Sequence, residues 1–274
     1  MAKRIGVVFS SGFFGFFAHA GFLAGIRKLG IRPVAFSGSS SGAILAAMAA
    51  CEMTDEQIKA ILFGLRREDF WDPDPWYKWA GALVRFFRGC TGYLNGMRFQ
   101  QLLQRCLPVQ FFEQCRVPVA VVATNLTSLR EEIFDRGDLI KAIAASGAVP
   151  GLFRPVSHNG AFFVDGGVVN KAPVKAILGL AEVDEIIVHF IASTTLLSPW
   201  AEVLDQRFTP WQIHRRAVDI ARHECYRRQC QEVASGGVKL TEVKSKTIAL
   251  GPKTLHKGPL AYKMAMDFTV QCLG

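Results

Sequence analysis

Residues 5–42 are IGVVFSSGFFGFFAHAGFLAGIRKLGIRPVAFSGSSSG. The apolar run Ile5–Phe9 ends in a Ser/Gly-rich turn and predicts a buried parallel strand, and the apolar stretch Phe16–Leu29 that follows predicts a helix. Pro33–Ser37 and the Ala-rich Gly42–Cys51 repeat this arrangement. Two strand-turn-helix units in succession favour an α/β fold with a mostly parallel central sheet flanked by helices in three layers.

The uncharged run from Ile5 to Ile26 is long enough to span a bilayer, and Ala18-His19-Ala20 imitates a signal-peptide cleavage site. Five glycines interrupt it, however, and the strand-turn-helix interpretation accounts for them. We therefore expect no signal peptide and no transmembrane helix, and a cytoplasmic protein that makes peripheral contact with the inner face of a membrane.

The composition limits the classes of function. Seven cysteines occur without a CxxC pair or a His/Cys ligand spacing, so we expect a reducing compartment and no zinc site. We expect no other metal and no cofactor. Half of the residues are hydrophobic and the mean hydropathy is +0.21, which favours an apolar site or a membrane-facing surface.

The remaining chain continues the alternation of strands and helices. Strands are predicted at Val117–Thr124, Glu131–Phe134, Phe162–Val164, Glu185–Ile191 and Thr247–Leu250, and helices at Leu139–Ser146, Ala172–Leu180, Trp211–Ala234 and Leu260–Cys272.

Two regions stand out by their side chains. Glu68–Phe99 combines Trp, Tyr and Phe with Lys78, Arg85 and Arg88, and we expect a lid or membrane-contact insert there. The net charge is +9, and Arg207–Lys257 holds eleven Lys/Arg against four Asp/Glu. Such a stretch suits anionic lipid headgroups or a solvated helix face; since no nucleic-acid motif accompanies it, we expect no nucleic-acid partner.

Gly38-Ser39-Ser40-Ser41-Gly42 fits G-x-S-x-G at a predicted strand-to-helix turn. Such a turn exposes its serine as a nucleophile, and small residues on both sides let strand and helix pack closely. The following helix places free N–H groups where negative charge develops. A Gly/Ser-rich loop can also be a plain turn, so the flanking strand and helix decide for a candidate nucleophile, Ser40.

A second Gly-rich turn, Gly12-Phe13-Phe14-Gly15, also lies between a predicted strand and a helix. A dinucleotide fingerprint would need a glycine at Ser10 and an acidic residue about twenty positions on, and residues 30–38 contain no acid. We interpret this turn as an oxyanion loop, in which the backbone N–H groups of Gly12 and Phe13 act with that of Ser41.

Asp165 follows a short apolar strand in Val-Asp-Gly-Gly. Asp-Gly-Gly is also an ordinary turn, but the carboxyl end of a strand is where open α/β sheets place their functional residues. Asp165 is therefore the candidate base for Ser40.

Together these motifs resemble the patatin-like phospholipase family over most of residues 5–192. That family pairs a Gly-rich oxyanion loop, a G-x-S-x-G serine and a D-G-[AG] aspartate, and residues 123–153 also look like its intervening segment. Ser10 replaces the family's usual first loop glycine, and Phe14 replaces its basic loop residue. The resemblance implies a patatin-like fold, with a catalytic domain over residues 1–205 and a basic helical extension, 206–274, packed on it.

The resemblance also implies a serine acyl hydrolase for fatty acyl esters of lipids. Ser40 would form an acyl-enzyme, Asp165 would take and return the proton, and water would complete hydrolysis. The phenylalanines of the Gly-rich loop and its helix, Phe14, Phe16 and Phe17, are expected to bind the acyl chain. The same serine would serve an acyltransferase or thioesterase, and a catalytically weak lipid-binding protein is a third possibility.

A triad is an alternative to the dyad, because His189 ends a predicted strand and follows Asp165 in the order used by α/β-hydrolases. A histidine at such a position is more often a buried core residue. The sequence leaves the oligomeric state open.

Overall fold

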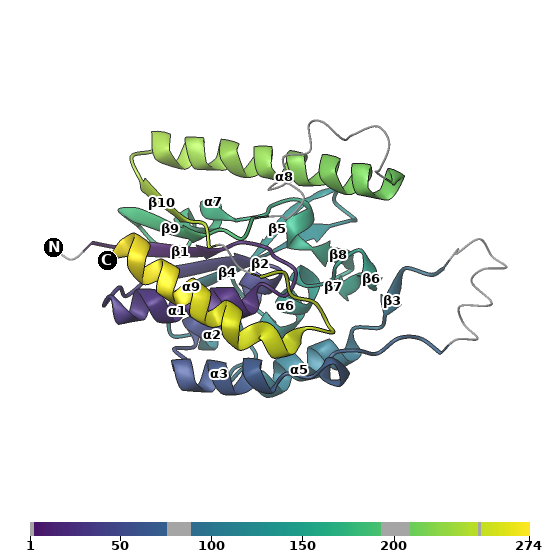
Figure 1. Cartoon of the computed structure of the whole chain (residues 1–274). Helices are drawn as coiled ribbons and strands as arrows, with labels where there is room; N and C mark the ends of the chain where they lie inside the picture. Colours follow the sequence, from purple (N-terminus) through teal and green to yellow (C-terminus); the bar gives the residue numbers. More distant parts are fainter. Residues whose placement is uncertain (1–2, 76–88, 193–208, 246–247) are drawn as a thin grey trace.

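The computed structural model describes residues 3–75, 89–192, 209–245 and 248–274 (Figure 1). The strands are β1 (Ile5–Phe9), β2 (Ala35–Ser39), β3 (Gly92–Leu94), β4 (Val119–Asn125), β5 (Arg130–Phe134), β6 (Gly151–Phe153), β7 (Val156–His158), β8 (Ala161–Asp165), β9 (Glu185–His189) and β10 (Lys239–Val243). The longer helices are α1 (Phe16–Lys28), α2 (Ser41–Ala50), α3 (Asp55–Gly64), α5 (Met97–Cys106), α6 (Leu139–Ser146), α7 (Val174–Leu178), α8 (Pro210–Ser235) and α9 (Gly258–Leu273).

Hydrogen-bonded neighbours in the central sheet follow the path β10-β9-β1-β2-β4-β8-β7, and β5 also pairs with β4. Strands β2 and β8 pair with different stretches of β4. From β10 to β4 along this path, every neighbouring pair is parallel. The pairs β4-β5, β4-β8 and β8-β7 are antiparallel. The predicted α/β fold with a mostly parallel sheet between helices is thus confirmed.

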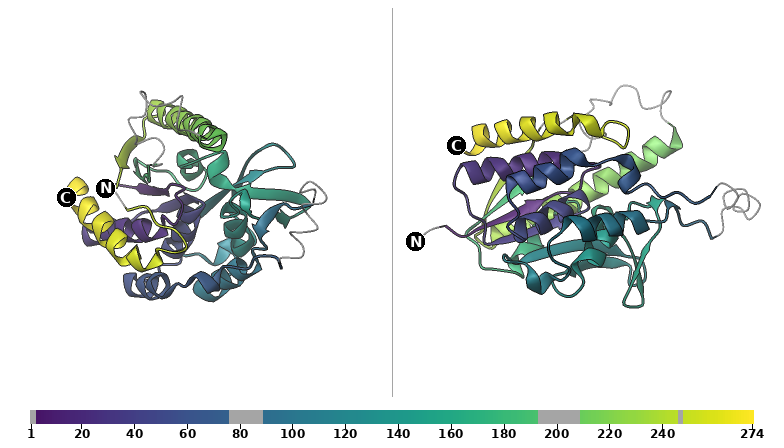
Figure 2. Two further views of the ribbon diagram at one scale, coloured as in Figure 1. Left: turned by 45° about the vertical axis from the view of Figure 1, so that its right-hand side comes forward. Right: turned by 90° about the horizontal axis from the view of Figure 1, so that it is seen from below.

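Alternation along the strands produces the two outer layers. In β1, Val7 and Phe9 pack into the cluster formed with α1, α2, α6 and α9, whereas Val8 packs into the cluster beneath α7 and α8. Successive side chains of a strand point to opposite faces, so a strand apolar at every position is covered on both sides. Figure 2 shows α7 and α8 on one face of the sheet and the other longer helices on the opposite face.

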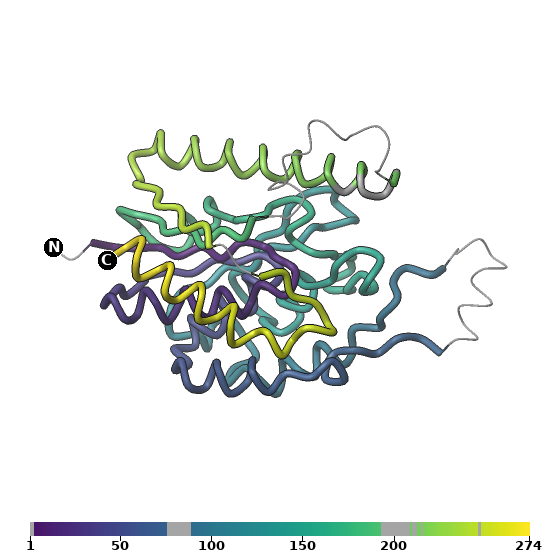
Figure 3. Tube along the Cα trace, viewed as in Figure 1, coloured from purple at the N-terminus to yellow at the C-terminus, as the bar shows by residue number. Residues whose placement is uncertain are grey.

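The first and last helices of the chain, α1 and α9, pack against each other. Helix α9 lies along α1, and a Cβ built on Gly21 of α1 would come 2.0 Å from the carbonyl oxygen of Tyr262 in α9. Gly25, one turn later, would meet the Thr269 side chain at 2.8 Å. Figure 3 shows this pairing of the first and last helices, and β1 begins at the same end of the molecule at which α9 ends. Two of the five glycines that interrupt the N-terminal apolar run, Gly21 and Gly25, therefore let α9 approach.

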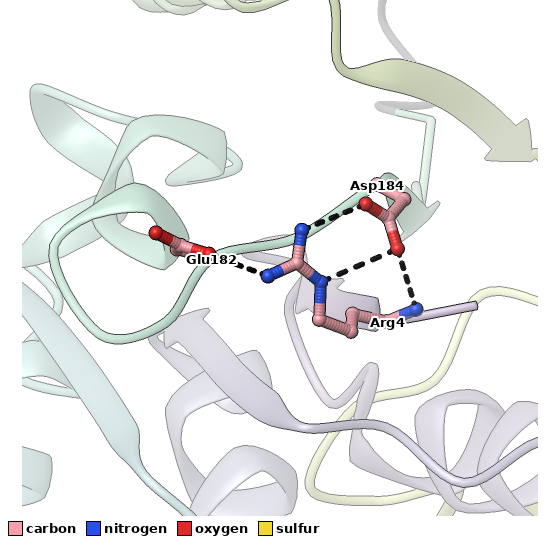
Figure 4. A network of polar contacts seen from close by, with 3 residues as sticks. All are labelled: Arg4, Glu182 and Asp184. Atoms are coloured by element: carbon pink, nitrogen blue, oxygen red, sulfur yellow. Dashed lines mark hydrogen bonds and ion pairs between the residues drawn. The ribbon is translucent and has the colours of Figure 1, made fainter. Parts of the chain in front are cut away.

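An ion-pair network fixes the start of β1 beside β9 (Figure 4). The Arg4 guanidinium donates to Asp184 Oδ1 at 2.9 Å and to Glu182 at 2.5 Å, and the Arg4 backbone N–H donates to Asp184 Oδ2 at 2.9 Å. These side chains are exposed, so the network contributes to register more than to stability.

The C-terminal part differs from the prediction in one element. The last strand is Lys239–Val243 rather than Thr247–Leu250, and no strand is assigned at residues 248–250. Strand β10 lies at the edge of the sheet, where polar side chains are tolerated, so its sequence KLTEV lacks the apolar character of a central strand. The domain boundary near residue 205 lies outside the described residues and stays a prediction.

The long basic helix predicted at Trp211–Ala234 is confirmed as α8 (Pro210–Ser235). Among the described residues, no helix combines the length and the apolarity needed to cross a bilayer.

Candidate active site

Strand pairing explains why Ser40 and Asp165 meet. On β4, Val122 pairs with Ser39 of β2, and the next residue, Ala123, pairs with Asp165 of β8. Because β5 occupies the other edge of β4 across both positions, β2 and β8 lie end to end along one edge. Strand β2 is parallel to β4 and β8 antiparallel, so their carboxyl ends face each other.

The turn after β2 holds Ser40 in a strained backbone conformation, with φ 56° and ψ −121°. The turn closes tightly, because a Cβ on Gly38 would lie 2.3 Å from the Gly42 carbonyl oxygen and one on Gly42 would lie 2.2 Å from that of Phe9. Both glycines of the G-x-S-x-G motif are thus required sterically, as expected for an elbow that presents its serine.

The Ser40 hydroxyl donates a hydrogen bond of 2.6 Å to Asp165 Oδ2. The other carboxylate oxygen, Oδ1, accepts the Gly167 N–H at 2.7 Å. Burial raises the pKa of Asp165 from 3.8 to about 6, while the hydrogen bonds from Ser40 and Gly167 and the charge of Arg222 oppose that rise. The carboxylate is therefore ionised at neutral pH, yet basic enough to accept a proton.

Two further hydroxyls support this pair. The Ser40 backbone N–H donates to Ser146 Oγ at 2.8 Å, and Ser146 in turn donates to the Val122 carbonyl at 2.6 Å. Thr124 Oγ1 donates to the Asp165 carbonyl at 2.8 Å. The sequence alone gives neither residue a role; the one visible sign is a serine, Ser146, at the end of a largely apolar helix.

The loop after β1 faces the nucleophile. Gly12, Phe13 and Ser41 line the same cavity as Ser40, and within the described part of the chain no acceptor binds their backbone N–H groups. A Cβ on Gly15 would come 3.1 Å from Ser41 Oγ, so loop and elbow are packed together. The three predicted oxyanion donors thus share one cavity with Ser40, and their role stays a prediction.

Ser10 has a structural role that a glycine could not supply. It is fully buried, and its hydroxyl accepts the backbone N–H of Ile191 at 2.8 Å. The bond ties the start of the loop to the residues that follow β9.

An apolar cavity of about 110 Å³ opens at Ser40. Its walls come from the loop after β1, the start of α1, helices α2, α3 and α5, and residues up to the end of β6. The apolar lining includes Phe14, Phe16, Ile44, Met48, Leu62, Phe70, Trp71, Leu103 and Phe153. Phe14 packs against Phe16 and Phe70, with ring centroids 5.6 and 5.7 Å apart. Two of the three predicted acyl-binding phenylalanines therefore lie in the cavity wall.

Phe17 does not line this cavity. It is fully buried, and a Cβ on Gly258 at the start of α9 would come 2.2 Å from its ring. Neighbouring residues on a helix point about 100° apart, so Phe16 faces the cavity while Phe17 faces α9.

His189 lies in a separate buried network. Its Nδ1 is 2.7 Å from Nδ1 of His19, and its Nε2 is 2.8 Å from the Ser245 hydroxyl. Burial lowers the pKa of both histidines. Both ring nitrogens of His189 are thus engaged away from Ser40, and the partner of the serine hydroxyl is Asp165.

Of the predicted insert Glu68–Phe99, residues 76–88 lie outside the described part, and with them Lys78, Arg85 and Arg88. Of the described remainder, Phe70, Trp71 and Phe99 line the cavity. Among the described residues, no three His, Cys, Asp or Glu side chains come together to hold a metal ion.

The chain is similar in sequence to a known family and to several known proteins. The family model described as patatin-like phospholipase matches residues 7–178. An uncharacterized NTE family protein of Mycobacterium tuberculosis is 27% identical over 187 residues, 65% of this chain and 47% of that protein. The lysophospholipase NTE1 of Mycosarcoma maydis is 27% identical over 217 residues, 76% of this chain and 11% of that protein.

Among solved structures, VipD from Legionella pneumophila matches 99% of this chain and 67% of its own, with 13% identity and a TM-score of 0.47. The chain thus matches less than half the length of the mycobacterial relative and a small part of the fungal enzyme.

Proposed function

Because the chain belongs to the patatin-like phospholipase family, we propose that it is a serine acyl hydrolase that cleaves fatty acyl esters of lipids. The observation that supports this most strongly is the 2.6 Å hydrogen bond from Ser40 Oγ to Asp165 at the end of an apolar cavity. Nucleophile and base are within proton-transfer distance, and an acyl chain has an apolar place to lie.

In the proposed mechanism the Ser40 oxygen attacks the ester carbonyl carbon while its proton passes to the Asp165 carboxylate. The carbonyl electron pair moves to oxygen, and the N–H groups of Gly12, Phe13 and Ser41 stabilise that charge. Asp165 then returns the proton to the departing alcohol oxygen. A water molecule, deprotonated by Asp165, releases the acid and restores Ser40.

The walls of the cavity favour an aliphatic acyl group. Phe14, Phe16 and Phe70 form one aromatic side, and aliphatic residues of α2, α3 and α5 form much of the rest. Each methylene group moved from water into such walls contributes about 0.8 kcal/mol. Turnover efficiency is therefore expected to rise with chain length until the cavity is filled.

We further propose that the enzyme works at the surface of an anionic membrane. Phe13 is 57% exposed although it lies at the cavity mouth, where a lipid would enter. An exposed aromatic ring inserts favourably at the headgroup level. The net charge of +9 adds attraction to anionic lipid.

The hydrolase is tested with p-nitrophenyl esters of increasing acyl length and with a lysophospholipid. Wild type should hydrolyse them with release of free fatty acid, and Ser40→Ala should lose the activity while melting normally. Ser157→Ala, an exposed serine on β7, is the matched control and should behave as wild type. Near-normal turnover by Ser40→Ala would overturn the assignment, and transfer of the acyl group to an added alcohol in preference to water would make the protein an acyltransferase.

The membrane proposal is tested by sedimentation with phosphatidylglycerol vesicles. Phe13→Ser should weaken binding, while Phe162→Ser, at a ring 54% exposed on β8, should not. Equal binding by both variants and wild type would exclude the cavity mouth as the contact.

A further inference from the structure

Helix α8 holds five of the eleven Lys/Arg of Arg207–Lys257, and one of them, Arg222, reaches the turn that holds the proposed base. We propose that Arg222 is a positioning residue that holds the Asp165-Gly166-Gly167 turn and stabilises the negative charge of Asp165. The inference rests on the proposed dyad, and it gives the basic helix a role in the reaction.

The contacts form a short path from the helix to the base. Arg222 Nη1 donates to the Gly167 carbonyl at 2.9 Å, and the Gly167 N–H donates to Asp165 Oδ1 at 2.7 Å. Gly167 packs closely against the loop after β1, because a Cβ there would lie 2.5 Å from Ser11 Oγ. A change at Arg222 would therefore reach both the base and the loop opposite Ser40.

The guanidinium is itself held in place. Asp219, one turn earlier on α8, is almost fully buried and pairs with Arg222 Nη2. The Arg222 side chain is 25% exposed, so solvent screens its charge less than that of a surface arginine. A planar guanidinium can bind a carboxylate and a carbonyl in fixed directions at once, which the ammonium of a lysine cannot reproduce.

The electrostatic effect follows from the groups around the turn. Arg222 lowers the pKa of Asp165, against the larger rise caused by burial. The buried Lys171 also lies close to Arg222 and Asp219, and burial, followed by repulsion from Arg222, lowers its pKa to about 8. Among the described residues, Arg222 is the charged side chain that acts on the Asp165 carboxylate.

The first test compares the pH dependence of kcat/KM in wild type, Arg222→Gln and Arg222→Lys from about pH 5 to about pH 9. Losing the cation raises the pKa of the base, so the acidic limb of the Arg222→Gln profile should move to higher pH, with kcat near neutral pH reduced about 10- to 100-fold. Arg222→Lys should keep the wild-type limb but recover only part of kcat. Arg227→Gln, an exposed arginine of α8 paired with Glu224, should match wild type.

A second measurement does not depend on catalysis. A folded-state pKa above the ordinary value makes wild type lose stability relative to Asp165→Asn as pH rises through about 6. In the Arg222→Gln background the same Asp165→Asn comparison should show a larger difference in Tm, extending to higher pH.

These results separate the two proposals. If wild type is inactive but the Tm difference is larger in the Arg222→Gln background, the hydrolase is contradicted and the electrostatic effect of Arg222 on Asp165 is supported. The role given to Arg222 would be overturned if the acidic limb of the Arg222→Gln pH profile coincided with that of wild type. It would also be overturned if Asp165→Asn changed the Tm equally in both backgrounds.

Discussion

Replacing Asp165 with Asn should make the protein more stable at neutral pH while it removes turnover. Asp165 is buried, and its pKa lies at about 6 rather than at 3.8. At about 1.36 kcal/mol for each pH unit, the ionised folded state is destabilised by about 3 kcal/mol above pH 6. Asn cannot ionise, and it can still accept the Gly167 N–H and donate to Ser40 Oγ, so most of this cost should disappear.

The stability gained by Asp165→Asn must depend on pH. The favourable contribution of the protonated carboxyl is fully present below about 3.8 and is lost as pH rises through about 6. Asp165→Asn should therefore melt close to wild type near pH 4 and several degrees higher near pH 8, since about 1 kcal/mol shifts the Tm of a chain of this size by about 2–4 °C. Calorimetry at both values measures the difference, with the exposed Asp267→Asn as control. An Asp165→Asn variant that is no more stable than wild type at pH 8 would refute the burial cost assigned to the base.

Three other predictions concern activity and packing. The kcat/KM of wild type should fall as pH decreases through about 6, because a protonated Asp165 cannot accept the serine proton; a rate that stays level down to about pH 4.5 would exclude it as the base. Gly21→Ala should lower the free energy of unfolding by about 1–3 kcal/mol in urea titrations, because its Cβ meets the backbone of α9 at 2.0 Å, whereas Gly64, with open space around it, should tolerate alanine. Ser10→Gly should lower the stability by about 1 kcal/mol through the lost bond to Ile191 N–H, and unchanged melting would show that water replaces it.

The first two strand-turn-helix units could be predicted because local patterns determine them. Apolar runs that end at glycine-rich turns specify buried strands and the helices after them, and Gly38 and Gly42 specify a tight turn around Ser40. The approach of Asp165 to Ser40 was expected from the family resemblance, and its physical cause, two strands meeting end to end along β4, depends on pairing that no local pattern encodes.

The supporting residues could not be predicted for the same reason. Ser146 and Arg222 act through contacts that span 106 and 55 positions in the chain. The sequence predicts Phe17 at the acyl site because it shows only that a helix carries this residue. The position of α9 decides which side of that helix is covered. The sequence does not indicate the edge strand β10, because KLTEV is neither a continuous apolar run nor a strict alternation of polar and apolar residues.

The central claim is that Ser40 is the nucleophile, and covalent labelling tests it most directly. The protein would be incubated with an alkyl fluorophosphonate at about pH 8, where Asp165 is ionised, and the modified residue located by peptide mass spectrometry. The proposed dyad predicts one adduct per chain on Ser40, with esterase activity lost in proportion to labelling. An adduct on another residue, or activity that persists when Ser40 is fully modified, would contradict it.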